Sequence, residues 1–204
     1  MRSASPDEIA RCTTWPKLRC GDCERRCTAD PVAADKQGEV DAILVALPFS
    51  ESGVATRAVY DEPFLVAMPI GHRLEKKKHI SSAELSRESL LLLGAGHCFR
   101  DQVLDLCASA KRGNRGALAR TLEGGSLETI RQMVASGVGL TVLPSTSVQA
   151  GEGGELISFR PFTRPVPDRR VVLAWRKSFP RPQAIEALRQ SILACDLQQV
   201  TKIQ

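Results

Sequence analysis

The sequence predicts an α/β fold in which strands alternate with helices. Short apolar runs of strand length recur from Gly38 onward, stretches with helical spacing of apolar residues lie between several of them, and capping or turn residues separate the two. Such alternation is typical of sheets whose strands are mostly parallel. Strands are predicted over 40–47, 64–69, 90–93, 118–122, 138–143, 156–159 and 170–175. A short helix is predicted to begin at 81–82, and longer helices are predicted over 98–110, 126–136 and 183–197.

The strand predictions depend on apolar runs that are too short for a buried helix. Residues 40–47 read VDAILVAL, residues 90–93 are four leucines, and residues 170–175 read RVVLAW. The run 64–69 follows Asp61 and Glu62, which we interpret as an acidic turn. These runs would form the buried sheets of the fold.

The helix predictions depend on capping residues and on periodicity. Ser81 and Ser82 precede Ala-Glu-Leu, which is typical of a short capped helix. Ser126 caps the helix that ends before Gly137, a residue suited to the stop position. The terminal helix places on one face Ile185, Leu188, Ile192 and Leu193.

Composition indicates a globular chain with one large domain or two small ones. The 204 residues are 43% hydrophobic and 25% charged, and only 4% are aromatic, so the core must be aliphatic. The net charge of +5 is spread along the chain and does not form the basic stripe of a nucleic-acid surface. No run approaches the length of a membrane span and no secretory signal opens the chain, so we expect a cytoplasmic protein without a membrane partner.

Residues 1–37 differ from the remainder, which we assign to one domain over 38–204. They contain four of the seven cysteines, and prolines interrupt any long helix, so we expect a poorly structured segment. Four thiolates can bind zinc, but this spacing lacks paired knuckles, so we predict no metal and keep a metal module as an alternative. The four cysteines are Cys12, Cys20, Cys23 and Cys27.

The segment with the clearest chemistry follows the strand that ends at Leu93. A glycine-flanked loop leads through Gly96 and His97 to Cys98, which opens a helix. Backbone N–H groups and the helix dipole favour a thiolate there, and His97 and Arg100 could act in the same direction. This arrangement is typical of a peroxide-sensitive cysteine.

Cys107 is the candidate second thiol, nine residues further along the same predicted helix. An intact helix would separate the two Cα atoms by about 13–14 Å, whereas a disulfide needs less than about 7 Å. A disulfide would therefore require the helix to unwind and would act as a switch. Two unrelated buried thiols are the alternative at this point.

The motifs GHCFRDQ…C and SLETIRQMVASGVGLTVLP resemble the OxyR group of LysR transcription regulators, from about Gly38 to the C-terminal helix. The resemblance implies that Cys98 is peroxidatic and Cys107 resolving. It also implies a periplasmic-binding-protein-like type II effector domain of two α/β subdomains. Subdomain I would contain 38–63 and 169–204, and subdomain II would contain 64–168.

The resemblance assigns further residues to a peroxide site that needs no cofactor. His97 and Arg169 would hold peroxide and stabilise the departing oxygen, and Thr28 matches one of the threonines of the family pocket. Gly96 and Ser126 would line the effector cleft. The implied partners are hydrogen peroxide, a thiol reductant for reset, and a second subunit in a homodimer or in a heterodimer with a full-length regulator.

The sequence departs from the family in two places. We expect no DNA-binding domain before the matching region and therefore no direct DNA binding by this chain. We also expect that residues 1–36 replace the first strand and first helix, so that the first subdomain is truncated. We expect a sensor rather than an enzyme. The alternatives are an effector domain for a small organic ligand with incidental cysteines, a cysteine enzyme that uses Cys98 with His97, and a non-functional fragment.

Overall fold

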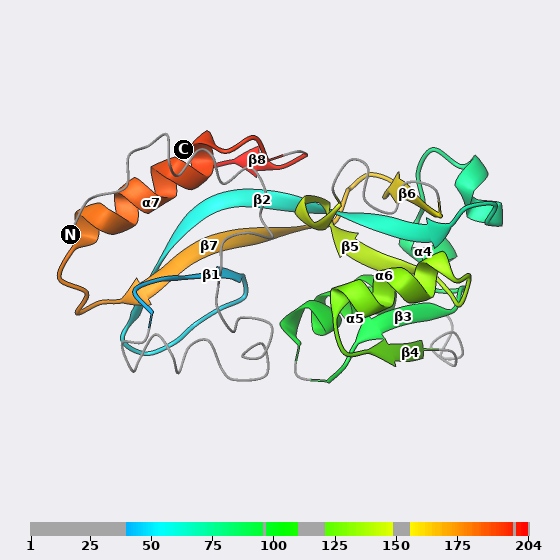
Figure 1. Ribbon diagram of the computed structural model, residues 1–204, viewed down its shortest axis with the longest axis horizontal. Coiled ribbons are helices and arrows are strands. Elements are labelled where there is room, and N and C mark those ends of the chain that lie inside the picture. Colours follow the sequence, from blue (N-terminus) through cyan, green and yellow to red (C-terminus); the bar gives the residue numbers. More distant parts are fainter. Residues whose placement is uncertain (1–39, 96, 110–120, 149–155, 198, 204) are drawn as a thin grey trace. The chain divides into compact units, whose positions relative to one another are not determined.

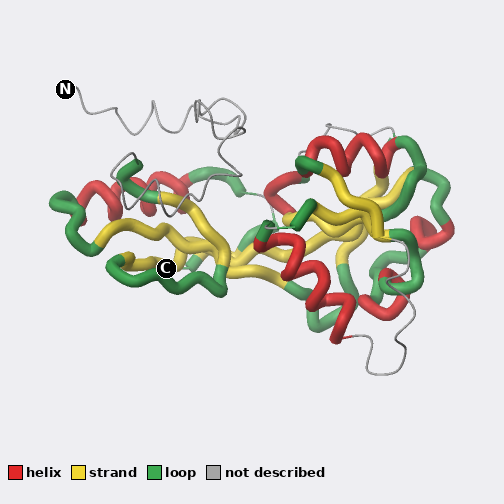
Figure 2. Tube along the Cα trace, turned by 90° about the horizontal axis from the view of Figure 1, so that it is seen from below, coloured by secondary structure: helices red, strands yellow, loops and turns green. Residues whose placement is uncertain are grey.

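A computed structural model describes residues 40–95, 97–109, 121–148, 156–197 and 199–203 (Figures 1 and 2). The chain forms two compact units. Of the described residues, the first unit contains those up to Glu62 and from Arg169 onward, and the second contains those within Pro63–Asp168. Residues 1–37, with the predicted loose segment and its metal alternative, lie outside the described residues.

The first unit is a sheet covered by the C-terminal helix. Strand β7 (Asp168–Arg176) pairs antiparallel with β1 (Ile43–Ala46) and neighbours β2 (Val54–Pro69), which pairs antiparallel with β8 (Thr201–Lys202). Helix α7 (Pro182–Ala194) lies along this sheet (Figure 1). The core between them contains Val59, Tyr60, Val171, Leu173, Ile185 and Ile192.

The second unit contains the larger core and a pair of parallel strands. Its strands, besides the end of β2, are β3 (Leu90–Leu93), β4 (Thr121–Gly124), β5 (Thr141–Pro144) and β6 (Ile157–Pro161). Its helices are η2 (Arg73–Lys76), α4 (Ser82–Leu85), α5 (Cys98–Ser109), α6 (Leu127–Ala135) and η3 (Ser145–Ser147). All four residues of β3 and all four of β5 are buried, which explains their continuous apolar sequence.

The α/β class is confirmed, but the expectation of mostly parallel sheets is wrong for the described residues. Strand β4 is parallel to β3, whereas β2 pairs antiparallel with β5, β6 and β8. The physical reason is connectivity. Helix α5 connects β3 to its parallel neighbour β4, as a helical crossover does for parallel strands, whereas β2 pairs antiparallel with strands from distant parts of the chain.

The predicted acidic turn at Asp61 and Glu62 is also wrong, because both residues lie within the continuous strand β2. Each carboxylate is paired with an arginine of β7, Arg170 and Arg169 respectively, so the strand continues through two adjacent acidic residues. The ends of several other strands differ from the prediction by a few residues, and β8 was not predicted.

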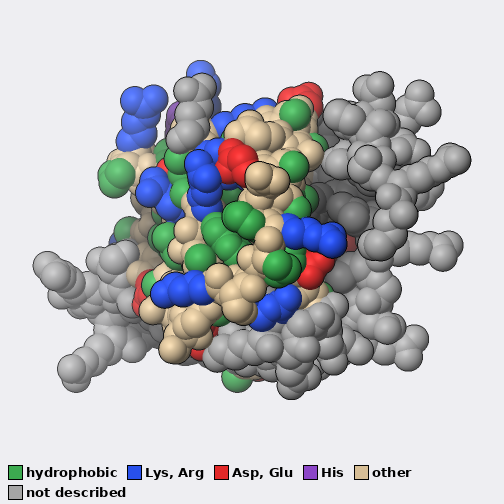
Figure 3. All heavy atoms as spheres, turned by 90° about the vertical axis from the view of Figure 1, so that its left-hand side faces the viewer, with side chains coloured by type: hydrophobic (Ala, Val, Ile, Leu, Met, Phe, Trp, Pro, Cys, Tyr) green, Lys and Arg blue, Asp and Glu red, His purple; other side chains and the backbone are tan. Residues whose placement is uncertain are grey.

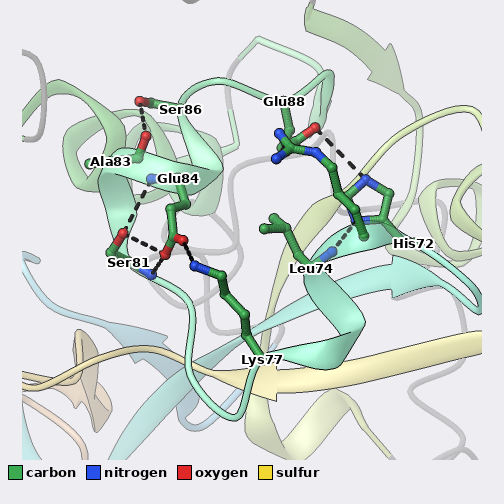
Figure 4. A network of polar contacts seen from close by, with 9 residues as sticks. His72, Leu74, Lys77, Ser81, Ala83, Glu84, Ser86 and Glu88 are labelled. Carbon is green, nitrogen blue, oxygen red and sulfur yellow. Dashed lines mark hydrogen bonds and ion pairs between the residues drawn. The ribbon is translucent and has the colours of Figure 1, made fainter.

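The predicted caps of the short helices are confirmed. Ser81 and Glu84 form a reciprocal capping box at the start of α4, in which each side chain accepts from the other residue's backbone N–H (Figure 4). Gly137 follows α6 with φ of +79°, a left-handed conformation that suits glycine at a helix end. Local sequence signals therefore indicate where α4 begins and where α6 ends.

The surface carries scattered rather than concentrated basic charge on the face in Figure 3. Lysine and arginine side chains there alternate with exposed hydrophobic and polar ones. Among the described residues, no helix has the length and apolar character to cross a membrane.

Candidate functional site

The parallel strands of the second unit end at one edge, and the candidate residues follow those ends. Strand β3 lies between β4 and the segment that leads into β5, since Leu90 forms a parallel bridge with Leu140. The pairing continues past β3, where Gly94 N–H donates to the carbonyl of Gly124 at 3.2 Å. Open α/β sheets bind ligands outside the carboxyl ends of their strands. This edge is therefore the candidate site.

Cys98 is the first residue of α5, in the position that the sequence predicted. The carbonyl of half-buried His97 accepts from the backbone N–H of Arg100 at 2.9 Å, which forms the first turn around Cys98. A thiol at such a helix start lies near uncompensated N–H groups that favour its thiolate form. Gly96 and the side chain of Cys98 lie outside the described residues.

Arg100 connects this first turn to the ends of the two parallel strands. Its guanidinium donates to the carbonyl of Leu93 at 3.1 Å and forms an ion pair with Glu123. Sequence reasoning placed Arg100 beside the thiol but missed Glu123. The carboxylate of Glu123, which is 23 residues away, pairs with the positive charge of Arg100. Arg100 therefore restrains α5 at the strand ends, in addition to any effect on the thiolate.

Cys107 lies at the other end of α5 and is a fully buried thiol. Phe99, Val103 and Cys107 are spaced four residues apart, so they share the helix face that packs into the core. The ring of Phe99 contacts that of Phe64 edge to face, with 5.6 Å between centroids. Because α5 is continuous from Cys98 to Ser109, the Cα atoms of the two cysteines lie about 13–14 Å apart.

Two serines lie at the same edge of the second unit. Ser126 caps α6 by accepting from the N–H of Thr129 at 3.1 Å, which confirms it as the cap. Ser145 directly follows β5 and is buried, and its hydroxyl has no hydrogen-bond partner among the described residues. Sequence reasoning missed Ser145, although its place after the strand-ending Pro144 was the signal available.

Arg169 lies in the first unit, at the start of β7, and forms an ion pair with Glu62. Its Nε donates to Glu62 Oε2 at 2.7 Å, and Glu62 is completely buried. The adjacent pair, Arg170 and Asp61, is bidentate and more exposed. The hydrogen bond from Arg170 holds the pKa of Asp61 below its usual value.

Tyr60 lies beside the Glu62–Arg169 pair and is the single tyrosine of the chain. Burial and the charge of Glu62 raise the pKa of Tyr60 to about 12, against an opposing contribution from Arg169. Sequence reasoning did not indicate Glu62 or Tyr60 as residues of the site, because Arg169, which pairs with Glu62, is more than a hundred residues away along the chain.

The remaining candidates cannot be placed. Thr28 and the cysteines of the metal alternative lie outside the described residues. Within the part of the chain that the structure describes, no group of three or more His, Cys, Asp or Glu residues could hold a metal ion.

Comparison with known proteins defines the class of the chain. The LysR substrate binding domain family matches residues 24–195. The chain therefore belongs to the LysR substrate-binding domain family. Within that family it resembles OxyR regulatory domains. The match includes Cys98 and Cys107 and extends over parts of both units.

Individual relatives carry peroxide-related names. The chain is 38% identical over 157 residues to a Mycobacterium avium protein named probable hydrogen peroxide-inducible genes activator, covering 77% of this chain and 50% of the relative. The reduced form of OxyR from N. meningitidis is 44% identical with a TM-score of 0.76, over 85% of this chain and 81% of that one. A hydrogen-peroxide-bound C206S mutant of Corynebacterium glutamicum OxyR is 26% identical with a TM-score of 0.72, over 80% and 51%. The chain spans about half the length of the Mycobacterium avium relative.

Proposed function

We propose that this chain is the redox-sensing regulatory domain of a hydrogen-peroxide-responsive LysR-type regulator, and that it switches through a Cys98–Cys107 disulfide. The observation that carries the proposal is the placement of the two cysteines on one helix. Cys98 begins α5 at the edge where the parallel strands end, and Cys107 is buried near the other end of that helix. The names of the relatives support peroxide as the signal.

The proposed chemistry has two steps. The Cys98 thiolate attacks one oxygen of hydrogen peroxide, the O–O bond breaks, and an S–O bond forms. The sulfur is oxidised to sulfenic acid while the departing hydroxide takes up a proton and leaves as water. The Cys107 thiolate then attacks the Cys98 sulfur, forming the S–S bond and releasing the second oxygen as water.

The second step couples chemistry to conformation. A separation of about 13–14 Å along α5 is far beyond disulfide reach, so the helix must unwind between the two cysteines. Cys107 must also leave a core in which it is completely buried. The disulfide would therefore select a conformation different from the one described, and a thiol reductant would restore the reduced fold.

We assign supporting roles to other candidate residues by the same resemblance. His97 and Arg169, with Thr28, would hold peroxide and stabilise the departing oxygen by hydrogen bonding and positive charge. Gly96 and Ser126 would line the effector cleft. The regulator would act as a dimer, with this domain supplying the sensing function.

The test is the thiol state of the chain by intact mass and peptide mapping, before and after a small excess of hydrogen peroxide. We expect rapid formation of a Cys98–Cys107 disulfide in the unaltered chain and a trapped sulfenic acid at Cys98 in Cys107→Ser. Cys195→Ser is the matched control, because Cys195 is half-buried at the end of α7, and it should oxidise like the unaltered chain. Slow oxidation scattered over all seven cysteines would overturn the proposal.

A further inference from the structure

We propose that the surface formed by Ile70, Lys76, Lys78 and Leu156 is a docking site for an acidic segment of a partner protein that also carries apolar side chains. All four residues belong to the second unit and are exposed. The proposal uses neither cysteine of the proposed switch, so the failure of one is distinguishable from the failure of the other.

The basic part of this surface is a run of three lysines, residues 76–78, where η2 ends. Lys77 turns toward α4 and forms an ion pair with Glu84 (Figure 4). Within the described part of the chain, Lys76 and Lys78 form no ion pair, and both are exposed. Two positive charges of the run are therefore left for a partner.

The acidic residues around the run do not neutralise it. The segment 73–79 holds four arginine and lysine residues and one acidic residue, Glu75. The carboxylate of Glu75 accepts from the backbone N–H of Gly71 at 2.6 Å, and that of Glu88 pairs with Arg73. The segment therefore keeps a net positive charge that attracts acidic groups.

Arg160 of β6 holds the backbone of the segment in place. Its guanidinium donates to the carbonyl of Glu75 at 2.9 and 3.1 Å and to that of Lys77 at 3.0 Å. Basic side chains at a helix end commonly bind such carbonyls, and here Arg160 performs that role in place of Lys76 and Lys78. A backbone that is ordered before binding loses less entropy when a partner arrives.

The apolar part of the surface consists of Ile70 and Leu156, the most exposed of the large hydrophobic side chains among the described residues, at 51% and 59%. Strand β2 pairs with β6 up to Pro69 and Ile157, and just beyond them the N–H of Ile70 donates to the carbonyl of Leu156 at 3.1 Å. Residues opposite each other on antiparallel strands point to the same face, with Cβ atoms about 4.5–5.5 Å apart. The two side chains therefore form one apolar patch rather than two isolated exposed residues.

The apolar patch and the lysines are within reach of one short peptide. Because a 3₁₀-helix such as η2 rises by about 2 Å per residue, Ile70 and Lys76 lie within about 15 Å of each other, a distance that about five extended residues span. Aliphatic side chains beside the lysines favour a polypeptide over a nucleic acid, which would be met by a longer basic stripe. An acidic segment with apolar side chains complements both parts of the surface.

The experiment measures the binding of fluorescein-labelled peptides to the full chain by fluorescence anisotropy. The leucine probe alternates glutamate with leucine, and the serine probe of the same length alternates glutamate with serine. A labelled DNA duplex tests a nucleic acid as the occupant. Salt is kept at about 0.1 M, where the Debye length of about 10 Å screens distant charges.

Two double variants reverse two exposed cations each. Lys76→Glu with Lys78→Glu changes the proposed surface, and Lys177→Glu with Arg181→Glu is the matched control in the first unit. We expect the first to weaken binding of the leucine probe by about 10-fold or more, and the control to change it by less than about 2-fold. Thermal unfolding verifies that both are folded, and glutamine replaces glutamate at both lysines if the first variant does not fold.

The apolar part is tested by Ile70→Ser with Leu156→Ser. We expect this variant to weaken binding of the leucine probe by about 5-fold or more, because its leucines lose their apolar contacts, and to leave the serine probe unchanged. In the unaltered chain, the leucine probe should bind more tightly than the serine probe.

Four results would overturn the inference. They are no binding of the leucine probe at concentrations up to about 1 mM, equal losses in the two charge-reversal variants, equal binding of the two probes, and tighter binding of the DNA duplex through the same lysines. Slow oxidation of Cys98 by hydrogen peroxide would instead remove the proposed function and leave this inference standing.

Discussion

Two acid–arginine pairs on strands β2 and β7 differ in burial although they are one residue apart. Glu62 pairs with Arg169, and Asp61 pairs with Arg170. Successive side chains of a strand point to opposite faces, so one carboxylate is completely buried and the other lies partly in solvent. The same chemistry therefore occurs in two dielectric environments within one short stretch of sheet.

The comparison teaches that burial, rather than ion-pair geometry, decides what each pair contributes. The exposed pair has the better geometry, since two nitrogens of Arg170 donate to two oxygens of Asp61 at 2.8 and 2.9 Å. Exposed pairs nevertheless contribute only about 0–1 kcal/mol because water and salt screen them. Removing one partner of a buried pair costs about 3–5 kcal/mol, because a charge is left without compensation in a poor solvent.

The largest expected effect is the loss of stability in Arg169→Ala. This change leaves the buried carboxylate of Glu62 without its arginine, and we expect the free energy of unfolding to fall by about 3–5 kcal/mol. Urea unfolding followed by circular dichroism measures it. Arg170→Ala is the control and should cost about 1 kcal/mol or less. Equal losses in the two variants would show that burial does not distinguish the pairs.

Tyr60 provides a spectroscopic probe of the buried pair, because no other tyrosine absorbs in this chain. In the folded chain its pKa is raised from 10.0 to about 12, chiefly by burial and then by Glu62. The raised folded pKa means that the stabilisation is complete below pH 10 and is lost as the pH rises from about 10 to about 12. This difference corresponds to about 3 kcal/mol, at about 1.4 kcal/mol for each pKa unit.

The prediction is that Glu62→Gln lowers the pKa of Tyr60 and that Arg169→Gln raises it, because the two charges act on the phenolate in opposite directions. Ultraviolet absorbance of the phenolate during an alkaline titration measures both. Asp61→Asn should leave the titration close to that of the unaltered chain. A Tyr60 pKa that does not respond to Glu62→Gln would mean that the carboxylate of Glu62 does not act on the phenol.

The paired strands also show what the sequence could and could not predict. The buried strands β3 and β5, the helix that Cys98 opens and the caps at Ser81 and Ser126 follow from local patterns, and the structure confirms them. Such features depend on neighbours within a few residues, which a single sequence displays directly. Two adjacent acidic residues read locally as a turn, because their arginines are 107 and 109 residues away.

The candidate site divides along the same line. Spacing and context predicted that Cys98 begins a helix. They also gave a buried thiol as one alternative for Cys107, and Cys107 is buried. Contacts between separate elements did not. Glu123 reaches Arg100 from the next strand, and Ser145 is buried after β5. Pairings of this kind depend on the order of strands in the sheet, which short motifs do not specify.

The exposed pair is expected to give a smaller effect that salt removes. Asp61→Asn should lower the free energy of unfolding by about 0–1 kcal/mol at low ionic strength, and by less at about 1 M salt, where the Debye length is about 3 Å. Because Arg170 depresses the folded pKa of Asp61, the contribution is present above the unfolded pKa and disappears as the pH falls through the folded value. Urea unfolding of the variant and the unaltered chain at several salt concentrations measures the difference. A large, salt-independent loss would place Asp61 in the same class as Glu62.

The smallest effect on stability is expected at Glu84, where an exposed pair is combined with a helix cap. Lys77 and Ser81 converge on its carboxylate (Figure 4) and lower its pKa from 4.5 to about 2, with the hydrogen bond from Lys77 as the largest cause. Since the folded pKa lies below the unfolded one, the contribution is complete above about pH 4.5 and is lost as the pH falls towards about 2. Lys77→Met should raise the pKa of Glu84 but leave it below 4.5, because the backbone and hydroxyl of Ser81 still donate to the carboxylate. Carboxyl chemical shifts in an NMR titration measure this, with Lys78→Met as the matched control. A Glu84 pKa that returned fully to 4.5 in Lys77→Met would mean that the capping box adds nothing to the ion pair.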